Sequence, residues 1–436
     1  MSFEKYAHFS HATGKMLALV KKPDNSVEEI EINSKQVGQD CLDEVCRRMN
    51  IVEVDYLGLK IVKKGERNLQ WLNLKNPLLQ QLQGHPVHWL ELRVKYHVEP
   101  HLLQQETTRH LFYLDAKKCL ENGKLCVPRK KAAVITALVA QAEHGDYNVQ
   151  HQQYDFCPTN DLTDEFKVMV ITEHNRMRGM RRSSAEYKLL QEAYPLEDYG
   201  LEFWHTDLTK EDNTNMACRF GVGNVGVVVR WKDNGTPVEK RILYSALVGS
   251  GTDGRYCDIS FRTDDYDTDS MRFKFGNKEQ AEGFYRAIIE SLTFFDRDTV
   301  SEEVLGQFTR DLKGTLASLF KEKTTVGKKY MFDIRRTAKE VYDYTRRQLF
   351  VTESKNPFAN IPEDGLNIDL DKPTDDSFKT KEEEILICRI CMVACIDTVF
   401  QCGHISCQDC ARRLNECHMC KGSVDPAIHI YLPTSS

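Results

Sequence analysis

Residues 388–420 read CRICMVACIDTVFQCGHISCQDCARRLNECHMC, and this stretch decides the architecture of the C-terminal part of the chain. It contains four short pairs of potential metal ligands: Cys388-x-x-Cys391, Cys402-Gly403-His404, Cys407-x-x-Cys410 and Cys417-x-x-Cys420. Two ligands of one tight turn bind a single zinc ion, with sulfur at about 2.3 Å. The four pairs therefore supply enough ligands for two closed tetrahedral zinc sites.

The distribution of the other cysteines supports this interpretation. Of the 15 cysteines, eight lie between Cys388 and Cys420. Scattered cysteines in a reducing compartment are usually buried apolar residues, whereas clustered ones more often bind metal. Cys395 also lies in the cluster, but its spacing from Cys391 suits a shared turn less well, and we expect it not to be a ligand. A chance cluster, a redox centre and a different structural zinc module are the alternatives.

The order of the four pairs resembles that of a RING domain. The resemblance implies a cross-brace, in which the first and third pairs share one zinc ion and the second and fourth pairs share the other. It assigns the two sites the ligands Cys388, Cys391, Cys407 and Cys410, and Cys402, His404, Cys417 and Cys420. Closed zinc sites have no open coordination position, so they hold a small domain together and do no chemistry themselves.

The RING resemblance also implies a surface for a ubiquitin-conjugating enzyme. Ile390 and Leu414 match the apolar contact residues, and Lys421 matches the basic linchpin that fixes ubiquitin against its carrier. Holding a thioester in place for attack is catalysis by orientation. The chain departs from the family at His418, where proline is usual. The alternative for Ile390 and Leu414 is that they form the core of a small domain.

The composition limits the classes of function. The chain has 436 residues, a net charge of −6, and hydrophobic and charged fractions of 41% and 28%. This length predicts about three domains. A nucleic-acid-binding protein usually has a basic surplus, so we expect no nucleic-acid partner. We find no apolar run near the roughly 20 residues that span a bilayer, and no signal peptide. A cytoplasmic location with reduced thiols is expected.

Residues 16–96 are expected to form a small mixed lobe. Apolar residues predict a strand over 27–32, and a half-buried strand follows from the strict alternation over 90–96. Leu42, Val45, Cys46 and Met49 have the i, i+3, i+4, i+7 spacing of one helix face. This order of strands and helix is typical of a ubiquitin-like fold.

The next two regions differ in the spacing of their apolar residues. Residues 97–199 are predicted to be all-helical, with helices over 131–144 and 184–194. Residues 200–300 return to alternating strands and end in one long helix, which opens at Asn277 with Gln280 three positions later. A run of strands closed by a C-terminal helix is the plan of a PH/PTB-like fold.

The order of these lobes resembles a FERM domain. The resemblance rests on Trp71-Leu72-Asn73-Leu74, on Leu92 to Tyr96 running into Pro100, and on Gly145-Asp146-Tyr147-Asn148. We expect a multidomain α+β chain with a three-lobed FERM domain and a C-terminal cross-brace zinc RING domain. The predicted units are an extension (1–15), a ubiquitin-like lobe (16–96), a helical lobe (97–199), a PH/PTB-like lobe (200–300), a basic helical segment (301–350), an acidic flexible linker (351–384) and the RING with a dimerisation strand (385–436).

A FERM domain followed by a RING resembles a family of ubiquitin ligases that mark lipoprotein receptors for degradation. Further similar stretches are Val54-Asp55-Tyr56, Arg310 to Gly314, Gly327 to Tyr330, and Tyr431-Leu432-Pro433. The resemblance implies two zinc ions, a ubiquitin-conjugating enzyme and a receptor tail as partners, and a homodimer formed by the RING. It also points to myosin regulatory light chain and to a peripheral position at the plasma membrane.

Tyr285 matches a substrate-contacting tyrosine of this family, on the C-terminal helix of the PH/PTB-like lobe. Ile289 lies one turn later, where the family has threonine. PTB folds bind an extended peptide as an added strand beside this helix. The alternative is that Tyr285 only borders the core.

The end of the chain carries a predicted dimer contact. Ile428, Ile430 and Leu432 alternate with polar positions, as in a strand with one apolar face. Such a strand needs a partner. It either packs on its own RING or, as the resemblance implies, places Ile430 and Leu432 in a self-complementary contact.

Two further patterns in the sequence give weaker signals. Gly221-x-Gly223-x-x-Gly226 resembles a dinucleotide loop but runs into a strand, so we interpret it as a turn and expect no bound nucleotide. An arginine cluster over 176–182 suits either an anionic membrane surface or an ordinary solvated loop. The leading hypothesis is a RING-type ubiquitin ligase, and the alternative is a non-catalytic FERM scaffold with a structural zinc module.

Overall fold

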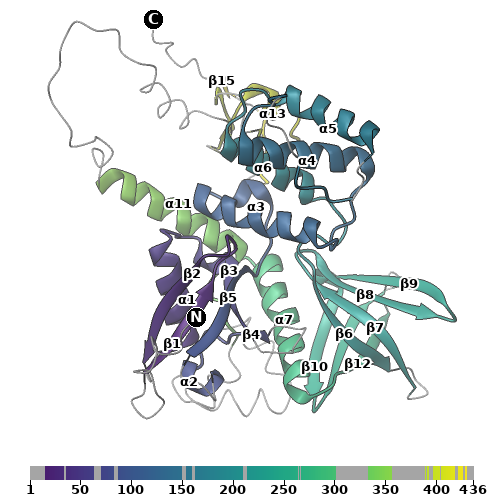
Figure 1. The fold of residues 1–436 in the computed structure, drawn as a ribbon. Helices are drawn as coiled ribbons and strands as arrows, with labels where there is room; N and C mark the ends of the chain where they lie inside the picture. Colours follow the sequence, from purple (N-terminus) through teal and green to yellow (C-terminus); the bar gives the residue numbers. More distant parts are fainter. Residues whose placement is uncertain are drawn as a thin grey trace, which may run out of the picture.

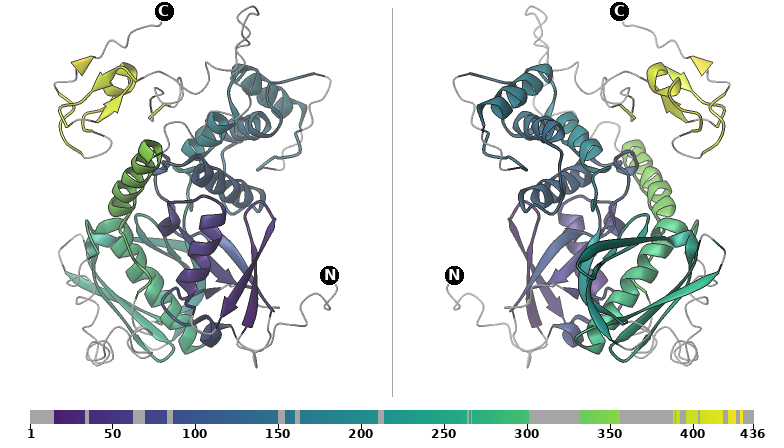
Figure 2. Two further views of the ribbon diagram at one scale, coloured as in Figure 1. Left: turned by 90° about the vertical axis from the view of Figure 1, so that its left-hand side faces the viewer. Right: turned by 90° about the vertical axis from the view of Figure 1, so that its right-hand side faces the viewer.

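The structure, a computed structural model, describes most of the chain. The described residues are 15–33, 36–62, 70–82, 87–149, 154–159, 163–209, 214–263, 265, 267–300, 332–355, 388, 390–391, 396–402, 404–417, 421–425 and 428–429. Three lobes meet at the centre, and the C-terminal cysteine-rich module lies beside the helical lobe and away from the PH/PTB-like lobe (Figures 1 and 2).

The first lobe is a five-stranded sheet covered by one helix. Its sheet order is β2-β1-β5-β3-β4, with β1 and β5 parallel and the other neighbours antiparallel. Leu42, Val45 and Cys46 are buried against the sheet, as their spacing predicts. The bounds are β1 Lys15–Lys21, β2 Val27–Asn33, α1 Gly38–Arg48, a 3₁₀ turn Val54–Tyr56, β3 Leu57–Ile61, β4 Gln70–Trp71, α2 Leu78–Gln81 and β5 Val87–Val94.

The second lobe is helical, as predicted. A 3₁₀ turn over Pro100–Leu102 leads into α3 Glu106–Glu121, α4 Arg129–His144, α5 Asp164–Arg176 and α6 Arg182–Ala193. Helix α4 packs against both α5 and α6 and is almost wholly buried in the middle. It ends at Gly145, whose φ of +79° favours glycine.

The third lobe is a seven-stranded antiparallel sheet closed by α7 Lys278–Asp296. The Asn277 side chain accepts a hydrogen bond from the Gln280 amide (2.8 Å), as expected for the cap. The Gln280 side chain accepts one from the amide of Gly276, one residue before the N-cap residue. The sheet order is β10-β11-β12-β6-β7-β8-β9. The strands are β6 Glu202–Thr209, β7 Asn215–Val222, β8 Gly226–Asp233, β9 Thr236–Leu243, β10 Leu247–Asp253, β11 Tyr256–Arg262 and β12 Thr268–Lys274, with a 3₁₀ turn at Tyr244–Ala246.

A segment after the third lobe returns to the first two lobes. Helix α11, Ala338–Lys355, begins with a reciprocal cap in which Thr337 and Glu340 each bind the other's backbone N–H. Val341 and Thr345 are buried, and Gln104 of the helical lobe donates to the Tyr342 carbonyl (2.6 Å). The helix continues to Lys355, past the predicted linker boundary at 351, and residues 356–384 lie outside the described part.

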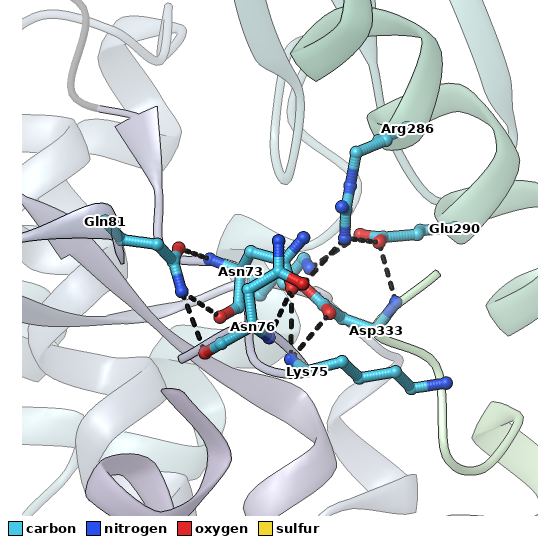
Figure 3. A network of polar contacts seen from close by, with 8 residues as sticks. Asn73, Lys75, Asn76, Gln81, Arg286, Glu290 and Asp333 are labelled. Carbon is cyan, nitrogen blue, oxygen red and sulfur yellow. Dashed lines mark hydrogen bonds and ion pairs between the residues drawn. The ribbon is translucent and has the colours of Figure 1, made fainter. Parts of the chain in front are cut away.

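A polar network joins these parts where the first and third lobes meet (Figure 3). Asp333 forms an ion pair with Arg286 of α7 (2.9 Å) and accepts a hydrogen bond from the Lys75 amide (3.3 Å). Glu290 of α7 accepts from Arg286 (3.0 Å) and from the Asp333 amide (2.9 Å). Residues 332–337, which we call the strap, connect the first and third lobes through these largely buried polar contacts.

The C-terminal module has little regular structure. Its elements are β13 Thr398–Val399, β14 Ile405–Ser406, α13 Gln408–Ala411 and β15 Ile428–His429, and the sheet order is β14-β13-β15. Two small apolar clusters support it. One surrounds Cys388, Ile396 and Cys407, and the other surrounds Phe400, Ala411 and Cys417. A core this small needs a further source of stability, such as bound metal.

Candidate functional site

The first metal cluster joins the first and third cysteine pairs. The sulfur atoms of Cys388, Cys391, Cys407 and Cys410 all lie within 4.8 Å of one another. Cys407 caps α13 and Cys410 lies within it, so the third pair is positioned by the start of that helix. The Cys391 and Cys407 sulfurs are 3.7 Å apart, close to the edge of about 3.8 Å expected for a tetrahedron with Zn–S bonds of about 2.3 Å.

The close packing of these four sulfur atoms disfavours their ionisation in the absence of a cation. Burial, and after it the neighbouring Cys407 thiol, raises the pKa of the Cys410 thiol. Burial also raises the pKa of Cys407. Four thiolates this close repel one another unless a cation lies between them. The donor set is purely sulfur, which suits zinc.

The second cluster is formed by Cys402, His404 and Cys417, whose ligand atoms also lie within 4.8 Å of one another. Cys402 and His404 lie in the tight turn between β13 and β14, where the Phe400 amide donates to the His404 carbonyl (2.8 Å). The Cys402 sulfur is 3.2 Å from His404 Nδ1. Cys420, the fourth expected ligand, lies outside the described residues.

The structure therefore brings the ligand pairs together in interleaved order. The first pair meets the third, and the second meets the described half of the fourth. Each cluster joins two turns that are distant in the sequence, which is the arrangement that the RING resemblance implied. Both clusters can hold a metal ion. Cys395 and His418 lie outside the described residues.

The residues expected to contact a conjugating enzyme lie at the surface of this module. Ile390 is partly buried against the first cluster and Leu414 against the second. Lys421 is exposed, and its φ of +59° fixes it in a backbone conformation that is uncommon for lysine. Its amide donates to the Cys417 carbonyl (2.9 Å), which holds its backbone close to the second cluster. The roles of all three stay predictions.

The C-terminal strand begins by packing on its own module. Ile428 and His429 of β15 pair with Val399 and Thr398 of β13. Ile428 is 63% exposed. Ile430 and Leu432, the predicted dimer contacts, lie outside the described residues.

A second candidate site lies in the third lobe. Strand β10 is an edge of the seven-stranded sheet and contacts α7. A Cβ at Gly249 or Gly251 would meet no atom within 4 Å, and Val248 is half exposed. An exposed edge strand beside a helix is the geometry that receives an extended peptide by strand addition.

The predicted substrate residues on α7 differ in accessibility. Tyr285 is partly buried beside the core, and its ring centroid lies 6.1 Å from that of Phe332 in the strap. Ile289 is only 2% exposed. A direct contact between Ile289 and a peptide would therefore require a movement of its neighbours, and its role stays a prediction.

The arginine cluster of the helical lobe is partly neutralised. Arg176 pairs with Glu173 (2.7 Å) and Arg182 with Glu186 (2.8 Å). The surface charge offered to an anionic membrane is therefore smaller than the sequence indicates. Binding to such a surface stays a prediction.

One contact was not predicted from the sequence. Gln191 of α6 donates from its side chain to the Ile390 carbonyl, between Cys388 and Cys391 (3.0 Å). An exposed glutamine on a helix gives no local sign of a partner 199 residues away, so sequence reasoning had no means of finding it.

Comparison with known proteins identifies the class of the N-terminal part. Residues 20–84 match the FERM N-terminal domain and residues 98–204 the FERM central domain. The chain is 30% identical over 213 residues to human tyrosine-protein phosphatase non-receptor type 4, a match that covers 47% of this chain and 22% of that protein. It is 27% identical over 289 residues to mouse FERM, ARHGEF and pleckstrin domain-containing protein 2, covering 63% and 26%. The chain thus spans about a quarter of the length of these relatives.

Solved structures agree on the fold. The FERM and C-terminal domain complex of Drosophila Merlin has a TM-score of 0.54 at 19% identity, covering 65% of this chain and 97% of that one. The MyTH4-FERM MF2 domain of Dictyostelium discoideum myosin VII has a TM-score of 0.50 at 10% identity, covering 63% and 59%. The chain therefore has the three-lobed fold of a FERM domain, followed by a C-terminal module whose cysteine clusters can bind metal. No helix of the described residues is both long and apolar enough to cross a bilayer.

Proposed function

We propose that the protein is a RING-type ubiquitin ligase that binds a receptor tail through its FERM domain and a ubiquitin-conjugating enzyme through its zinc module. The observation that supports this proposal best is the interleaved pairing of the two ligand clusters, with four sulfur atoms within 4.8 Å in the first. Together with the resemblance of residues 388–420 to a RING, it favours a ligase over an unrelated zinc module.

The proposed cofactors are two zinc ions. Cys388, Cys391, Cys407 and Cys410 would hold one ion, and Cys402, His404, Cys417 and Cys420 would hold the other. Bound in this way, the ions would stabilise the turns and would have no open position for substrate. Ile390, Leu414 and Lys421 would then form the surface that binds the conjugating enzyme and its ubiquitin.

The proposed reaction is transfer of ubiquitin to a substrate lysine. The neutral lysine amine attacks the thioester carbonyl that joins the ubiquitin C-terminus to the cysteine of the conjugating enzyme. A new C–N amide bond forms, the C–S bond breaks, the thiolate leaves, and the amine loses a proton to solvent. The ligase contributes orientation, since Lys421 would hold ubiquitin in one position against its carrier.

The proposed substrate is the cytoplasmic tail of a membrane receptor of the lipoprotein-receptor class. An extended tail would add to the outer side of β10, with side chains against α7 near Tyr285. This assignment rests on the open edge of β10 and on the resemblance to the myosin regulatory light chain interacting protein. The protein would act in the cytoplasm at the inner face of the plasma membrane, and would dimerise through its RING.

Self-ubiquitination in a purified system tests the ligase proposal. The full chain is combined with ubiquitin, activating enzyme, ATP and a panel of conjugating enzymes. We expect ubiquitin chains on the protein with at least one panel member, and strong loss of the product in Lys421→Ala. A zinc-loaded, folded protein that transfers no ubiquitin with any panel member would contradict the proposal.

A non-catalytic FERM scaffold is the second candidate. It is favoured by His418, which stands between the last two cysteines where RING ligases usually have proline. Self-ubiquitination by the wild-type chain separates the two candidates, because a scaffold transfers no ubiquitin. If His418 is the cause of inactivity, His418→Pro should gain activity, whereas a ligase is already active with histidine.

A further inference from the structure

Helix α6 of the FERM domain has two faces with different environments. Ala185, Leu189, Leu190 and Ala193 belong to the apolar cluster of the helical lobe. At about 100° per residue, Tyr187 and Gln191 lie roughly 130° and 170° around the helix from the centre of that stripe. They are one turn apart, so both project from the same outer face.

Tyr187 is nevertheless buried, with 1% of its surface exposed. Its phenol lies within electrostatic range of Arg109 of α3 and of Cys388, Cys391 and Cys410 in the first cluster. The phenol therefore lies close to the first zinc cluster. An outer-face residue with this environment indicates that the zinc module covers this part of α6.

Gln191 provides a direct contact on the same face. Its Nε2 donates a hydrogen bond to the Ile390 carbonyl (3.0 Å). Ile390 lies between Cys388 and Cys391 and packs on the first zinc cluster. The turn that contacts α6 is thus the turn assigned to the conjugating enzyme.

We propose that the outer face of α6, marked by Tyr187 and Gln191, is an intramolecular docking surface for the first zinc turn and competes with the conjugating enzyme for Ile390. The inference rests on the proposed ligase function, because the competition concerns that same surface. In the docked form the FERM domain restrains the RING. A conjugating enzyme binds fully only when the zinc turn leaves α6.

The size of the effect follows from the contact. One hydrogen bond of this kind changes an equilibrium by about 2- to 10-fold. When only a fraction of the protein is in the binding-competent form, the apparent affinity equals the intrinsic affinity multiplied by that fraction. Loss of the Gln191 contact should therefore strengthen binding of the conjugating enzyme by up to about 10-fold.

The test uses the full chain with two variants that each add one negative charge. Gln191→Glu keeps the size of the side chain, removes the N–H donor and places a carboxylate opposite the Ile390 carbonyl. Gln80→Glu makes the same change at an exposed position of α2 in the ubiquitin-like lobe. Amide hydrogen exchange measures docking of the zinc turn, and titration with each member of the conjugating-enzyme panel measures competition.

We expect Gln191→Glu, but not Gln80→Glu, to speed exchange around Cys388 to Cys391 and in α6, and to tighten conjugating-enzyme binding by about 2- to 10-fold. Unchanged exchange would overturn the docking, whether or not the protein is a ligase. Faster exchange with unchanged affinity would overturn the competition. If exchange becomes faster and no panel member binds either variant, the ligase proposal fails and the regulatory inference fails with it, while the docking contact remains.

Discussion

Lys95 of the ubiquitin-like lobe and Glu290 of the PH/PTB-like lobe form an ion pair of 2.7 Å. Their side chains are 10% and 4% exposed, respectively. Glu290 also accepts from Arg286 and from the Asp333 amide, so one carboxylate connects two lobes and the strap. Removing one partner of a buried pair leaves an uncompensated charge, which costs more than the pair itself contributes.

We predict that Glu290→Gln lowers the free energy of unfolding of the FERM domain by about 3 kcal/mol, because Lys95 loses its charged partner and Arg286 keeps only Asp333. All four tryptophans lie in the FERM domain, so denaturant unfolding followed by tryptophan fluorescence reports on it alone. Glu282→Gln, in the same helix but in a surface pair with Lys278, is the control and should cost under about 0.5 kcal/mol. Equal losses in the two variants would contradict the structure.

The same carboxylate predicts a pH dependence. Burial raises the pKa of Glu290, but Lys95 and Arg286 outweigh it and hold the pKa at about 2, below the ordinary value of 4.5. A lowered pKa contributes stability that is fully present above pH 4.5 and is lost as the pH falls toward 2. The stability difference between wild type and Glu290→Gln should therefore shrink across this range. A difference that stays constant from pH 6 to pH 3 would show that Glu290 is not held ionised.

Local patterns were sufficient to predict much of this fold. The alternation over 90–96 and the apolar spacing along 131–144 correspond to β5 and α4, because each pattern reflects burial on one face of its own element. The same holds for α7 with its Asn277 cap. The residues that form each pattern lie close together in the sequence, so the pattern can be recognised without knowledge of the tertiary structure.

The parts that could not be predicted depend on distant partners. Ile289 follows the buried Ile288 on α7 and was expected to face a substrate, yet both are buried. Phe332 beside Tyr285 and Gln191 beside Ile390 are contacts between residues far apart in sequence. No periodicity within either segment carries that information. The candidate metal ligands of the two clusters could be predicted from the sequence because each pair needs only one tight turn.

Metal content gives a direct test of the two clusters. We predict that the full chain binds two zinc ions, and that Cys410→Ser and Cys402→Ser each retain one, because each substitution removes a ligand of a different cluster. Native mass spectrometry counts the ions. Cys395→Ser is the matched control and should keep both. A wild-type protein with a single ion would overturn the paired arrangement.

Tyr285 should matter for tail binding and not for ubiquitin transfer. We predict that Tyr285→Ala weakens binding of a lipoprotein-receptor tail peptide by about 30-fold, the loss typical of an aromatic contact worth about 2 kcal/mol. Fluorescence anisotropy measures the affinity. Self-ubiquitination should be unchanged, since Tyr285 lies in the third FERM lobe. Lys421→Ala gives the reverse pattern, with normal tail binding and reduced transfer. Unchanged affinity in folded Tyr285→Ala would place the tail elsewhere.

The final prediction concerns the strand after the last zinc ligand. Among the described residues β15 pairs with β13 on one side only, and Ile428 on it is largely exposed. A strand edge with apolar side chains favours association with a second copy. Ile430→Asp combined with Leu432→Asp should give a monomer with reduced transfer, because two unpaired carboxylates at an apolar contact cost roughly several kcal/mol. Light scattering measures the mass, and the zinc content should stay at two because no ligand changes. Ser435→Asp adds charge nearby and should leave the dimer intact. A wild-type protein that is monomeric at tens of micromolar would contradict the predicted dimer and leave the prediction of two zinc sites unchanged.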